Sequence, residues 1–311
     1  MVRLAPPARA DTGARPSVTF APSPPAAPGR VRGELVPPGV GLLQSPARRA
    51  PAFRPGGPVK TVASALAATG TLVPAYVALR ALAPAASVRI PELYCAILAR
   101  SLGVQVGLRG KVASGAVLYV ANHLSWLDIL VLGARLEGAF VAKHEVGQMA
   151  LVNTLARLRD TIFVERERRS RAASQASEVA ARLRRGGNVI LFPEGTSNDG
   201  VRILPFKSTL FAGLDAAPDA RVQPVTLAYT EVNGLPLTRS RLLELAWIGD
   251  MELAPHALDM SRIGRIRAEV HCHPPVRPAD FPDRKALARH CHAAVEARYR
   301  RLVRGEREAA Q

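Results

Sequence analysis

Residues 122–128, Asn-His-Leu-Ser-Trp-Leu-Asp, contain a histidine and an aspartate five positions apart, His123 and Asp128. Histidine is the commonest general base in enzymes, and a neighbouring carboxylate can orient its ring. The segment follows an apolar run that predicts a strand and precedes the apolar stretch 129–132, which predicts a helix. A turn between them would let His123 face Asp128 at the rim of a sheet, where ligands bind. The pair therefore indicates proton-transfer chemistry.

A structural role for the same residues is also open. Ser125 is a favourable N-cap residue, and Asp128 would then be the third residue of the helix, as in a capping box. In that arrangement Asp128 only completes the helix start, and His123 is an ordinary polar residue. The seven residues alone do not decide between catalysis and capping.

Further residues that could bind an anionic group follow three other apolar runs. They are Lys143 after residues 139–142, Arg166 after residues 161–164, Glu194, Gly195 and Thr196 after residues 188–192, and Lys207 at the start of a predicted helix. Cations and exposed amides at several strand ends can form a pocket for an anionic headgroup, and arginine can bind phosphate through two parallel hydrogen bonds. Taken singly, Arg166 could be one of several solvated arginines, and Gly195 could be only a turn residue.

The elements that must position these residues have an α/β pattern. From Val104 onward, short apolar runs alternate with helical stretches. The predicted strands are residues 117–121, 139–142, 161–164, 188–192, 222–228 and 266–272. The predicted helices 168–185 and 284–303 each combine an apolar stripe with an arginine-rich face.

The N-terminal third differs from this pattern. Residues 1–58 hold 13 of the 26 prolines, eight arginines and only two acids, which predicts a disordered basic tail unless translation begins after it. Residues 61–79 carry no charge, and at ~1.5 Å per residue they could cross a ~30 Å hydrocarbon layer. Gly70 and Pro74 would kink this helix, so a tilted span, an interfacial helix and a buried core helix all remain open.

Residues 92–102 repeat apolar side chains at helical spacing and predict a second, amphipathic helix. Together the two helices would form an N-terminal membrane-docking hairpin. The chain then divides into a disordered tail (residues 1–58), a membrane-associated helical segment (residues 59–102) and an α/β domain (residues 103–305). The N-terminus shows no secretory signal pattern.

The charge balance favours anionic partners. The chain has 42 basic and 25 acidic residues, a formal charge of +17 and a pI near 11.1, so anionic lipid headgroups, nucleic acid and acidic carrier proteins are all conceivable partners. A non-enzymatic basic protein that binds membranes or nucleic acid is the rival class. Aromatic content is only 5% and no nucleic-acid-binding motif is recognised, so we expect no nucleic-acid partner.

Two His-Cys-His triplets, residues 271–273 and 290–292, suggest a metal site. On the predicted helix, however, His290 and His292 would point ~200° apart, so both triplets cannot present all their ligands. We therefore expect no metal. Three cysteines are an odd number that does not suggest a disulfide framework, which favours a reducing, cytoplasm-facing location.

Four blocks occur in an order that resembles the lysophospholipid and glycerolipid acyltransferase family. They are the His-Asp block 122–128, the apolar strand ending at Arg166, the turn Pro-Glu-Gly-Thr at 193–196, and Val-Gln-Pro-Val at 222–225. The resemblance implies a mixed sheet flanked by helices, with a helical membrane segment before it. It also implies a membrane-bound enzyme that moves an acyl chain from an acyl carrier protein or coenzyme A thioester to a lysolipid hydroxyl.

By the same resemblance, His123 would be the general base and Asp128 its orienting partner. The acceptor site would consist of Arg166, Glu194, Gly195 and Thr196, with Lys143 and Lys207 nearby. Glu194 is like-charged to phosphate, so we expect it to hold Arg166 or another cation in place. No cofactor and no acyl-enzyme intermediate are implied, and the expected location is the cell inner membrane with the active site facing the cytoplasm.

The sequence departs from the family where the acceptor is concerned. Members that act on 1-acylglycerol-3-phosphate often carry an arginine just after the Gly-Thr pair, where this chain has Ser197. Thr161 also replaces a glycine common at the start of the arginine strand. The Ser-Asn-Asp-Gly variant at 197–200 and the segment 247–253 resemble the branch that acylates lyso-ornithine lipid. We rank 1-acylglycerol-3-phosphate first on the family's commonest activity, with lyso-ornithine lipid as the alternative.

Overall fold

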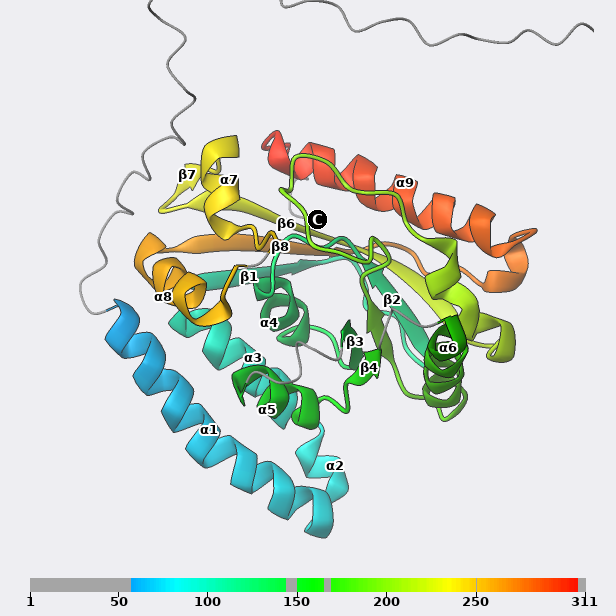
Figure 1. Ribbon diagram of the computed structural model, residues 1–311, viewed down its shortest axis with the longest axis horizontal. Coiled ribbons are helices and arrows are strands. Elements are labelled where there is room, and N and C mark those ends of the chain that lie inside the picture. Colours follow the sequence, from blue (N-terminus) through cyan, green and yellow to red (C-terminus); the bar gives the residue numbers. More distant parts are fainter. Residues whose placement is uncertain (1–56, 144–149, 165–168, 250, 307–311) are drawn as a thin grey trace, which may run out of the picture. The chain divides into compact units, whose positions relative to one another are not determined.

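The fold is built around one mixed sheet (Figure 1). A computed structural model describes residues 57–143, 150–164, 169–249 and 251–306. The strands within these ranges are β1 (Val104–Arg109), β2 (Val117–Ala121), β3 (Ala139–Lys143), β4 (Ile162–Val164), β5 (Val189–Leu191), β6 (Arg221–Val232), β7 (Leu235–Pro236) and β8 (Ile266–Cys272). They are arranged in the order β1-β8-β6-β2-β5-β3-β4, with β7 paired to β6. The pairs β6–β8 and β6–β7 are antiparallel and the other pairs are parallel, so the predicted mixed α/β class is confirmed.

Helices cover both faces of this sheet. They are α1 (Gly57–Leu82), α2 (Pro84–Ser87), α3 (Ile90–Ser101), α4 (Leu127–Gly133), α5 (Ala150–Leu158), α6 (Arg169–Arg184), α7 (Arg239–Leu245), α8 (Leu253–Ile263) and α9 (Arg284–Val303), with 3₁₀ segments η2 (Ser208–Ala216) and η3 (Pro278–Asp280). Side chains of α3, α4 and α8 pack on one face, and side chains of α6, η2 and α9 pack on the other. The helix predicted after Lys207 is the 3₁₀ segment η2.

Strand β2 lies at the centre of the sheet and is buried on both sides. Its side chains alternate between the two cores: Tyr119 and Ala121 belong to the α3/α4 face, and Leu118 and Val120 to the α6/α9 face. This alternation follows from the period of two residues in a strand. A central, fully buried strand is a rigid support, and the candidate site begins at its carboxyl end.

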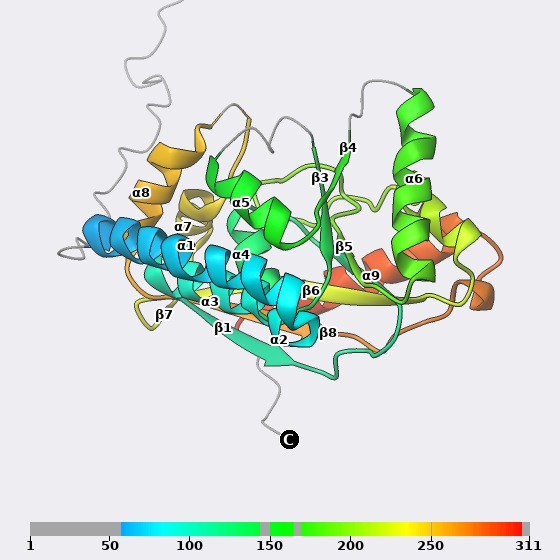
Figure 2. The ribbon, with the colours of Figure 1, turned by 90° about the horizontal axis from the view of Figure 1, so that it is seen from below.

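The two N-terminal helices pack together but have different surroundings. Helix α3 buries Tyr94, Cys95 and Leu98 in the core beside α4. Helix α1 runs alongside α3 (Figure 2), and Thr69 of α1 hydrogen-bonds to the Tyr94 hydroxyl at 2.9 Å. The apolar face of α3 is therefore covered by protein, and the membrane-docking role predicted for the pair falls on α1.

Helix α1 is long and apolar enough to cross a membrane. Its 26 residues include an 18-residue window of mean hydropathy 1.6, of which only 6% is buried. A core helix of a soluble protein would be mostly buried, so this exposure indicates association with a membrane. Pro74 lies inside the helix. Most of the predicted tail, residues 1–56, lies outside the described residues, and the three predicted domain boundaries stay predictions.

Candidate active site

The site lies where β2 and β5 end side by side. The two strands are parallel neighbours, with Val120 paired to Leu191, so the loops that follow them emerge at the same edge. One loop contains His123 and leads into α4, and the other contains Glu194 and leads toward η2. Parallel pairing thus brings together residues 71 positions apart in the sequence.

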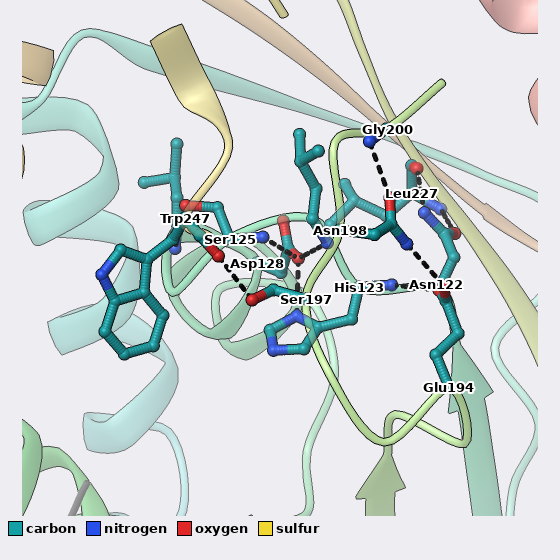
Figure 3. A network of polar contacts seen from close by, with 12 residues as sticks. Asn122, His123, Ser125, Asp128, Glu194, Ser197, Asn198, Gly200, Leu227 and Trp247 are labelled. Atoms are coloured by element: carbon teal, nitrogen blue, oxygen red, sulfur yellow. Dashed lines mark hydrogen bonds and ion pairs between the residues drawn. The ribbon is translucent and has the colours of Figure 1, made fainter. Parts of the chain in front are cut away.

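His123 and Asp128 face each other, as the sequence predicted. The distance between His123 Nδ1 and Asp128 Oδ2 is 2.8 Å (Figure 3). The Asp128 side chain is 0% exposed and that of His123 is 16% exposed. Because an ionised carboxylate only accepts hydrogen bonds, Nδ1 carries the proton and Nε2 is left as an acceptor. A partly exposed imidazole beside a buried carboxylate is the arrangement that a general base requires.

The Asp128 carboxylate has three donors besides the imidazole. Oδ2 accepts the backbone N–H groups of Leu124 at 2.6 Å and Ser125 at 2.8 Å. Oδ1 accepts the hydroxyl of Tyr229 at 2.7 Å. Buried carboxylates are costly unless their lone pairs are satisfied, and these bonds offset that cost. They also fix the plane of the carboxylate.

The predicted capping box is wrong in one half. The N-cap residue is Trp126, without a side-chain cap, and the Asp128 amide donates to the Ser125 carbonyl rather than to its hydroxyl. The other half holds, since the Asp128 carboxylate accepts the Ser125 amide. Asp128 therefore closes the turn and orients His123 at the same time, so the two readings of the sequence are compatible.

Two contacts that the sequence analysis missed hold the turn in place. The Asn122 amide group donates to the Leu227 carbonyl at 2.8 Å and accepts the Leu227 N–H at 2.9 Å, so it extends the β2–β6 ladder by a side chain. The His123 ring stacks on Phe192, with 4.0 Å between centroids and 14° between planes. Asn122 lies inside the His-Asp block 122–128, but nothing in the sequence indicates that Leu227 is its partner.

The described partners of Glu194 are neutral groups, and the contact predicted with Arg166 lies outside the described residues. Its side chain is buried, its Oε1 accepts the His123 N–H at 2.7 Å, and its Oε2 accepts the Leu204 N–H at 2.8 Å and the Asn198 amide at 2.5 Å. Burial raises the pKa of Glu194 to about 7. All three described partners are neutral donors and none is a cation. Glu194 therefore organises the loop after β5 and ties it to the amide of His123.

The loop after β5 bends sharply and contacts the segment that follows α7. Gly195 has φ +75°, a conformation that favours glycine, and Thr196 is exposed. The Ser197 hydroxyl donates to the Trp247 carbonyl at 2.5 Å, and the Trp247 N–H donates to the Leu124 carbonyl at 3.2 Å. Ser197, the position that departs from the family pattern, therefore holds Trp247 between the two site loops (Figure 3).

The predicted cations are not brought together in the described part of the chain. Lys143 ends β3, but its side chain is outside what the structure describes, and Arg166 lies outside the described residues altogether. Lys207 is exposed, and its backbone N–H donates to the Pro193 carbonyl at 2.8 Å. The anion-binding half of the predicted site therefore stays a prediction.

Two further contacts brace the site from outside. Trp126 Nε1 donates to His256 Nδ1 at 2.9 Å, which links the start of α4 to α8. The Tyr299 hydroxyl of α9 donates to the Gly200 carbonyl at 2.6 Å, which links α9 to the loop after β5. Neither was found from the sequence, because the partners lie 130 and 99 residues apart.

The His-Cys-His triplets have separate surroundings. His271 of β8 contacts His273 just after the strand, with 4.8 Å between ring centroids, and His273 Nε2 bonds the Thr226 hydroxyl at 2.8 Å. On α9, His290 packs against Phe281, and His292 packs against Phe206. Within the described ranges no three histidine, cysteine or acidic side chains gather as a metal site.

Comparison with known proteins assigns the family. The acyltransferase family model matches residues 103–228, which include both site loops. The chain is 42% identical over 216 residues to a lyso-ornithine lipid O-acyltransferase of Brucella abortus, covering 67% of this chain and 81% of that protein. It is 34% identical over 236 residues to the Pseudomonas aeruginosa protein of the same name, covering 74% and 88%.

Two further similarities concern another acceptor. The chain is 34% identical over 140 residues to a 1-acyl-sn-glycerol-3-phosphate acyltransferase of Neisseria gonorrhoeae, covering 45% of this chain and 54% of that protein. The crystal structure of the 1-acyl-sn-glycerophosphate acyltransferase PlsC from Thermotoga maritima matches with a TM-score of 0.61 over 82% of this chain and 97% of that one. At 20% identity this match concerns the fold. The chain belongs to the acyltransferase family and is an enzyme that transfers acyl groups.

Proposed function

We propose that this enzyme transfers a fatty acyl chain from a thioester to the free hydroxyl of a lysolipid, with His123 as general base. The observation that carries the proposal is the 2.8 Å contact between His123 Nδ1 and the fully buried carboxylate of Asp128. A lysolipid hydroxyl is a poor nucleophile at neutral pH, so it needs a base as it attacks. Among the described residues nothing bonds His123 Nε2, which leaves that atom available to the hydroxyl proton.

The reaction can be followed atom by atom. The hydroxyl oxygen attacks the thioester carbonyl carbon while His123 Nε2 takes the hydroxyl proton. Asp128 stabilises the imidazolium through Nδ1. When the tetrahedral intermediate collapses, the carbon–sulfur bond breaks and the departing thiolate takes the proton back from Nε2. The products are an ester and a free thiol, and the mechanism requires no covalent acyl-enzyme.

The acceptor that we propose is lyso-ornithine lipid. Relatives named for this acceptor cover 67% and 74% of the chain, whereas the gonococcal relative named for 1-acylglycerol-3-phosphate covers 45%. Position 197 is a serine, so it offers no cation to a phosphate, and its hydroxyl already donates to the Trp247 carbonyl. The sequence alone ranked the two acceptors in the opposite order, because the family's commonest activity set the expectation there.

1-Acylglycerol-3-phosphate is the second candidate acceptor. It is favoured by the gonococcal relative and by the retained arginine at position 166. Guanidinium groups bind phosphate well. If this acceptor is used, another cation, such as Lys143, Lys207 or Arg202, must take the place of the arginine that position 197 lacks.

The donor and the location complete the proposal. We infer an acyl carrier protein or coenzyme A thioester as donor, since either supplies the leaving thiol and both are anionic, opposite to the +17 charge of the chain. We place the enzyme at the cell inner membrane with its site facing the cytoplasm. The exposed apolar helix α1 supports membrane attachment, and three buried cysteines, none in a disulfide, are in keeping with a reducing compartment.

One assay tests donor and acceptor together. The purified full chain is mixed with each thioester and with equal amounts of lyso-ornithine lipid and 1-acylglycerol-3-phosphate, and the products are identified by mass spectrometry. We expect ornithine lipid to dominate. Phosphatidate as the main product would reverse the acceptor assignment, and no acylated lipid with either donor would refute the proposed function.

A matched pair of variants then examines position 197. Ser197→Ala removes only the bond to Trp247, whereas Ser197→Arg also adds a cation. If position 197 reads the headgroup, Ser197→Arg shifts the preference toward 1-acylglycerol-3-phosphate and Ser197→Ala does not. If both variants shift it equally, the position of Trp247 is what sets the preference.

A further inference from the structure

Strand β6 extends beyond β2 and passes beside the catalytic turn. The two strands are parallel, and their last paired residues are Ala121 and Val225. Tyr229 lies four positions further along β6, about 13 Å past that pair at ~3.3 Å per residue. The turn that holds His123 and Asp128 begins just after Ala121. Tyr229 is therefore level with this turn, and its side chain is buried in the α3/α4 core.

The strand is irregular at this point. Its antiparallel register with β8 shifts between Tyr229, which pairs with Ala268, and Glu231, which pairs with Arg267. The extra residue is Thr230. Such bulges occur near active sites, where they re-aim a side chain. Here the tyrosine hydroxyl reaches Asp128 Oδ1 at 2.7 Å, on the oxygen opposite the one that contacts His123.

We propose that Tyr229 is a positioning residue for the reaction, whose hydroxyl holds the Asp128 carboxylate so that Oδ2 faces His123. This inference rests on the proposed function of the His123–Asp128 pair. Oδ2 has three donors, but the tyrosine is the only described donor to Oδ1. Without it the carboxylate is free to tilt about its last bond, and one buried oxygen loses its partner.

The hydroxyl also moderates the charge that the imidazole meets. A donor to the carboxylate withdraws part of its negative charge, so removing that donor strengthens the attraction between Asp128 and the imidazolium. Burial and the nearby Asp128 charge raise the pKa of Tyr229 well above its ordinary value, so it stays a neutral donor across the working pH range. Among the described residues, the other ionisable groups that face this pair are His123, Glu194 from the loop after β5 and Tyr299 from α9.

The test is Tyr229→Phe in the full-length enzyme, which removes one oxygen and keeps the ring. We expect kcat to fall about tenfold, while KM for the lysolipid and for the thioester stays within about twofold. The acid limb of the pH–rate profile should move to higher pH, because a more stable imidazolium keeps the base protonated longer. Tyr119→Phe is the matched control, since it removes another buried tyrosine hydroxyl. That hydroxyl donates to the Ala113 carbonyl at 3.3 Å and does not contact the turn.

A double-mutant cycle separates positioning from a merely structural role. If Tyr229 acts through Asp128, Tyr229→Phe changes kcat by less than about twofold in an Asp128→Asn background. A structural role alone would lower the melting temperature and leave kcat and the pH profile of the folded enzyme unchanged. That result, or equal loss of kcat in both backgrounds, overturns the proposal.

Two further measurements distinguish failure of this proposal from misfolding of Tyr229→Phe and from failure of the proposed function. Replacing Tyr229 by 3-fluorotyrosine keeps the packing of the ring and makes the hydroxyl a stronger donor. The acid limb of the pH–rate profile should then move to lower pH. The absence of this shift overturns the proposal even if Tyr229→Phe does not fold. His123→Ala is measured alongside. Activity in His123→Ala refutes the proposed function itself, whereas an inactive His123→Ala beside a normal Tyr229→Phe refutes only the role of Tyr229.

Discussion

The turn after β2 and the helix α1 differ in which kind of side chain is exposed to solvent. At the turn, the carboxylates of Asp128 and of Glu194 from the loop after β5 are buried, and each carboxylate oxygen has at least one neutral or imidazole donor. On α1, apolar side chains lie on the outside, with Leu66 69% exposed and Val77 63% exposed. One region therefore buries polar groups, and the other exposes apolar groups.

The difference shows what each region is for. Burying a carboxylate is costly unless it is fully hydrogen-bonded, so a network of this kind is maintained where a charge must stand in a fixed place. Exposed apolar surface is costly in water, so it implies a second apolar phase that covers it. In the proposed function the turn supports the chemistry, and α1 attaches the enzyme to the membrane where its lipid substrate lies.

The largest effect is expected at the turn itself. His123→Ala removes the base, so kcat should fall by at least about a hundredfold, the usual scale of general-base loss. Lysolipid binding, measured by equilibrium titration, should persist, because the imidazole is not assigned to the headgroup. Near-normal turnover by a folded variant would return His123 to a structural role.

Asp128→Asn should follow, with a loss of at least about tenfold. The amide can still accept the backbone N–H groups of Leu124 and Ser125, but it carries no charge to stabilise the imidazolium. Circular dichroism and the melting temperature check that the turn is intact. Full activity would mean that Asp128 only closes the turn.

The membrane-docking role of α1 is tested by placing charges on its exposed apolar face. Leu66 and Val77 are eleven residues apart and so lie on one face of the helix. The double variant Leu66→Glu, Val77→Glu should move most of the protein from membranes to the soluble fraction on sedimentation, because charged groups are expensive in hydrocarbon. Its kcat on detergent-dispersed substrate should stay within about twofold.

The control for that variant is Leu243→Glu, which places the same charge on an exposed leucine of α7. It should stay with the membrane. Sedimentation of the α1 variant with membranes as before would refute the docking role of α1. Deleting residues 1–102 is a poor substitute for this experiment, because it also removes Tyr94 and Leu98 from the core.

The smallest effect concerns pH and Glu194. Its pKa is about 7 in the folded protein, above its ordinary value of 4.5, so the folded state binds more protons than the unfolded state between these values. Stability should therefore fall as pH rises from about 4.5 to about 7, by on the order of 1 to 3 kcal/mol. Glu194→Gln should be less stable at every pH, because an amide nitrogen replaces an acceptor, but the pH slope should flatten. Thermal melts at pH 5 and pH 8 measure this; an unchanged slope would contradict it.

Much of the fold follows from local patterns. Strands β2 and β8 and helix α9 match their predicted residues, because each has a clear apolar period and polar flanks. Strand β6 continues beyond the predicted end at Ala228, since Glu231 and Val232 still pair with both β7 and β8. The sequence predicted that helix α3 docks on the membrane, because apolar spacing does not tell whether lipid or protein covers the apolar face of a helix.

The site was predictable in its residues and less so in its contacts. His123 and Asp128 are close in sequence, so their geometry follows from one turn. The partners of Glu194 and the donor to Asp128 Oδ1 depend on which strands become neighbours, and a sequence period carries no information on that. The cations were predicted from their charge, their place at strand ends and the family resemblance; Lys207 is exposed, and their role in binding stays a prediction.

The ladder between Asn122 and Leu227 has a consequence for how the enzyme matures. This contact and the one from Tyr229 to Asp128 join residues 105 and 101 positions apart. Long loops must close before such contacts form, which makes them late events in folding. A chain that has formed its helices and its local turn still lacks a competent base until β6 is in place. On refolding, activity should thus return after the helical circular dichroism signal, and a partly folded enzyme would transfer no acyl groups.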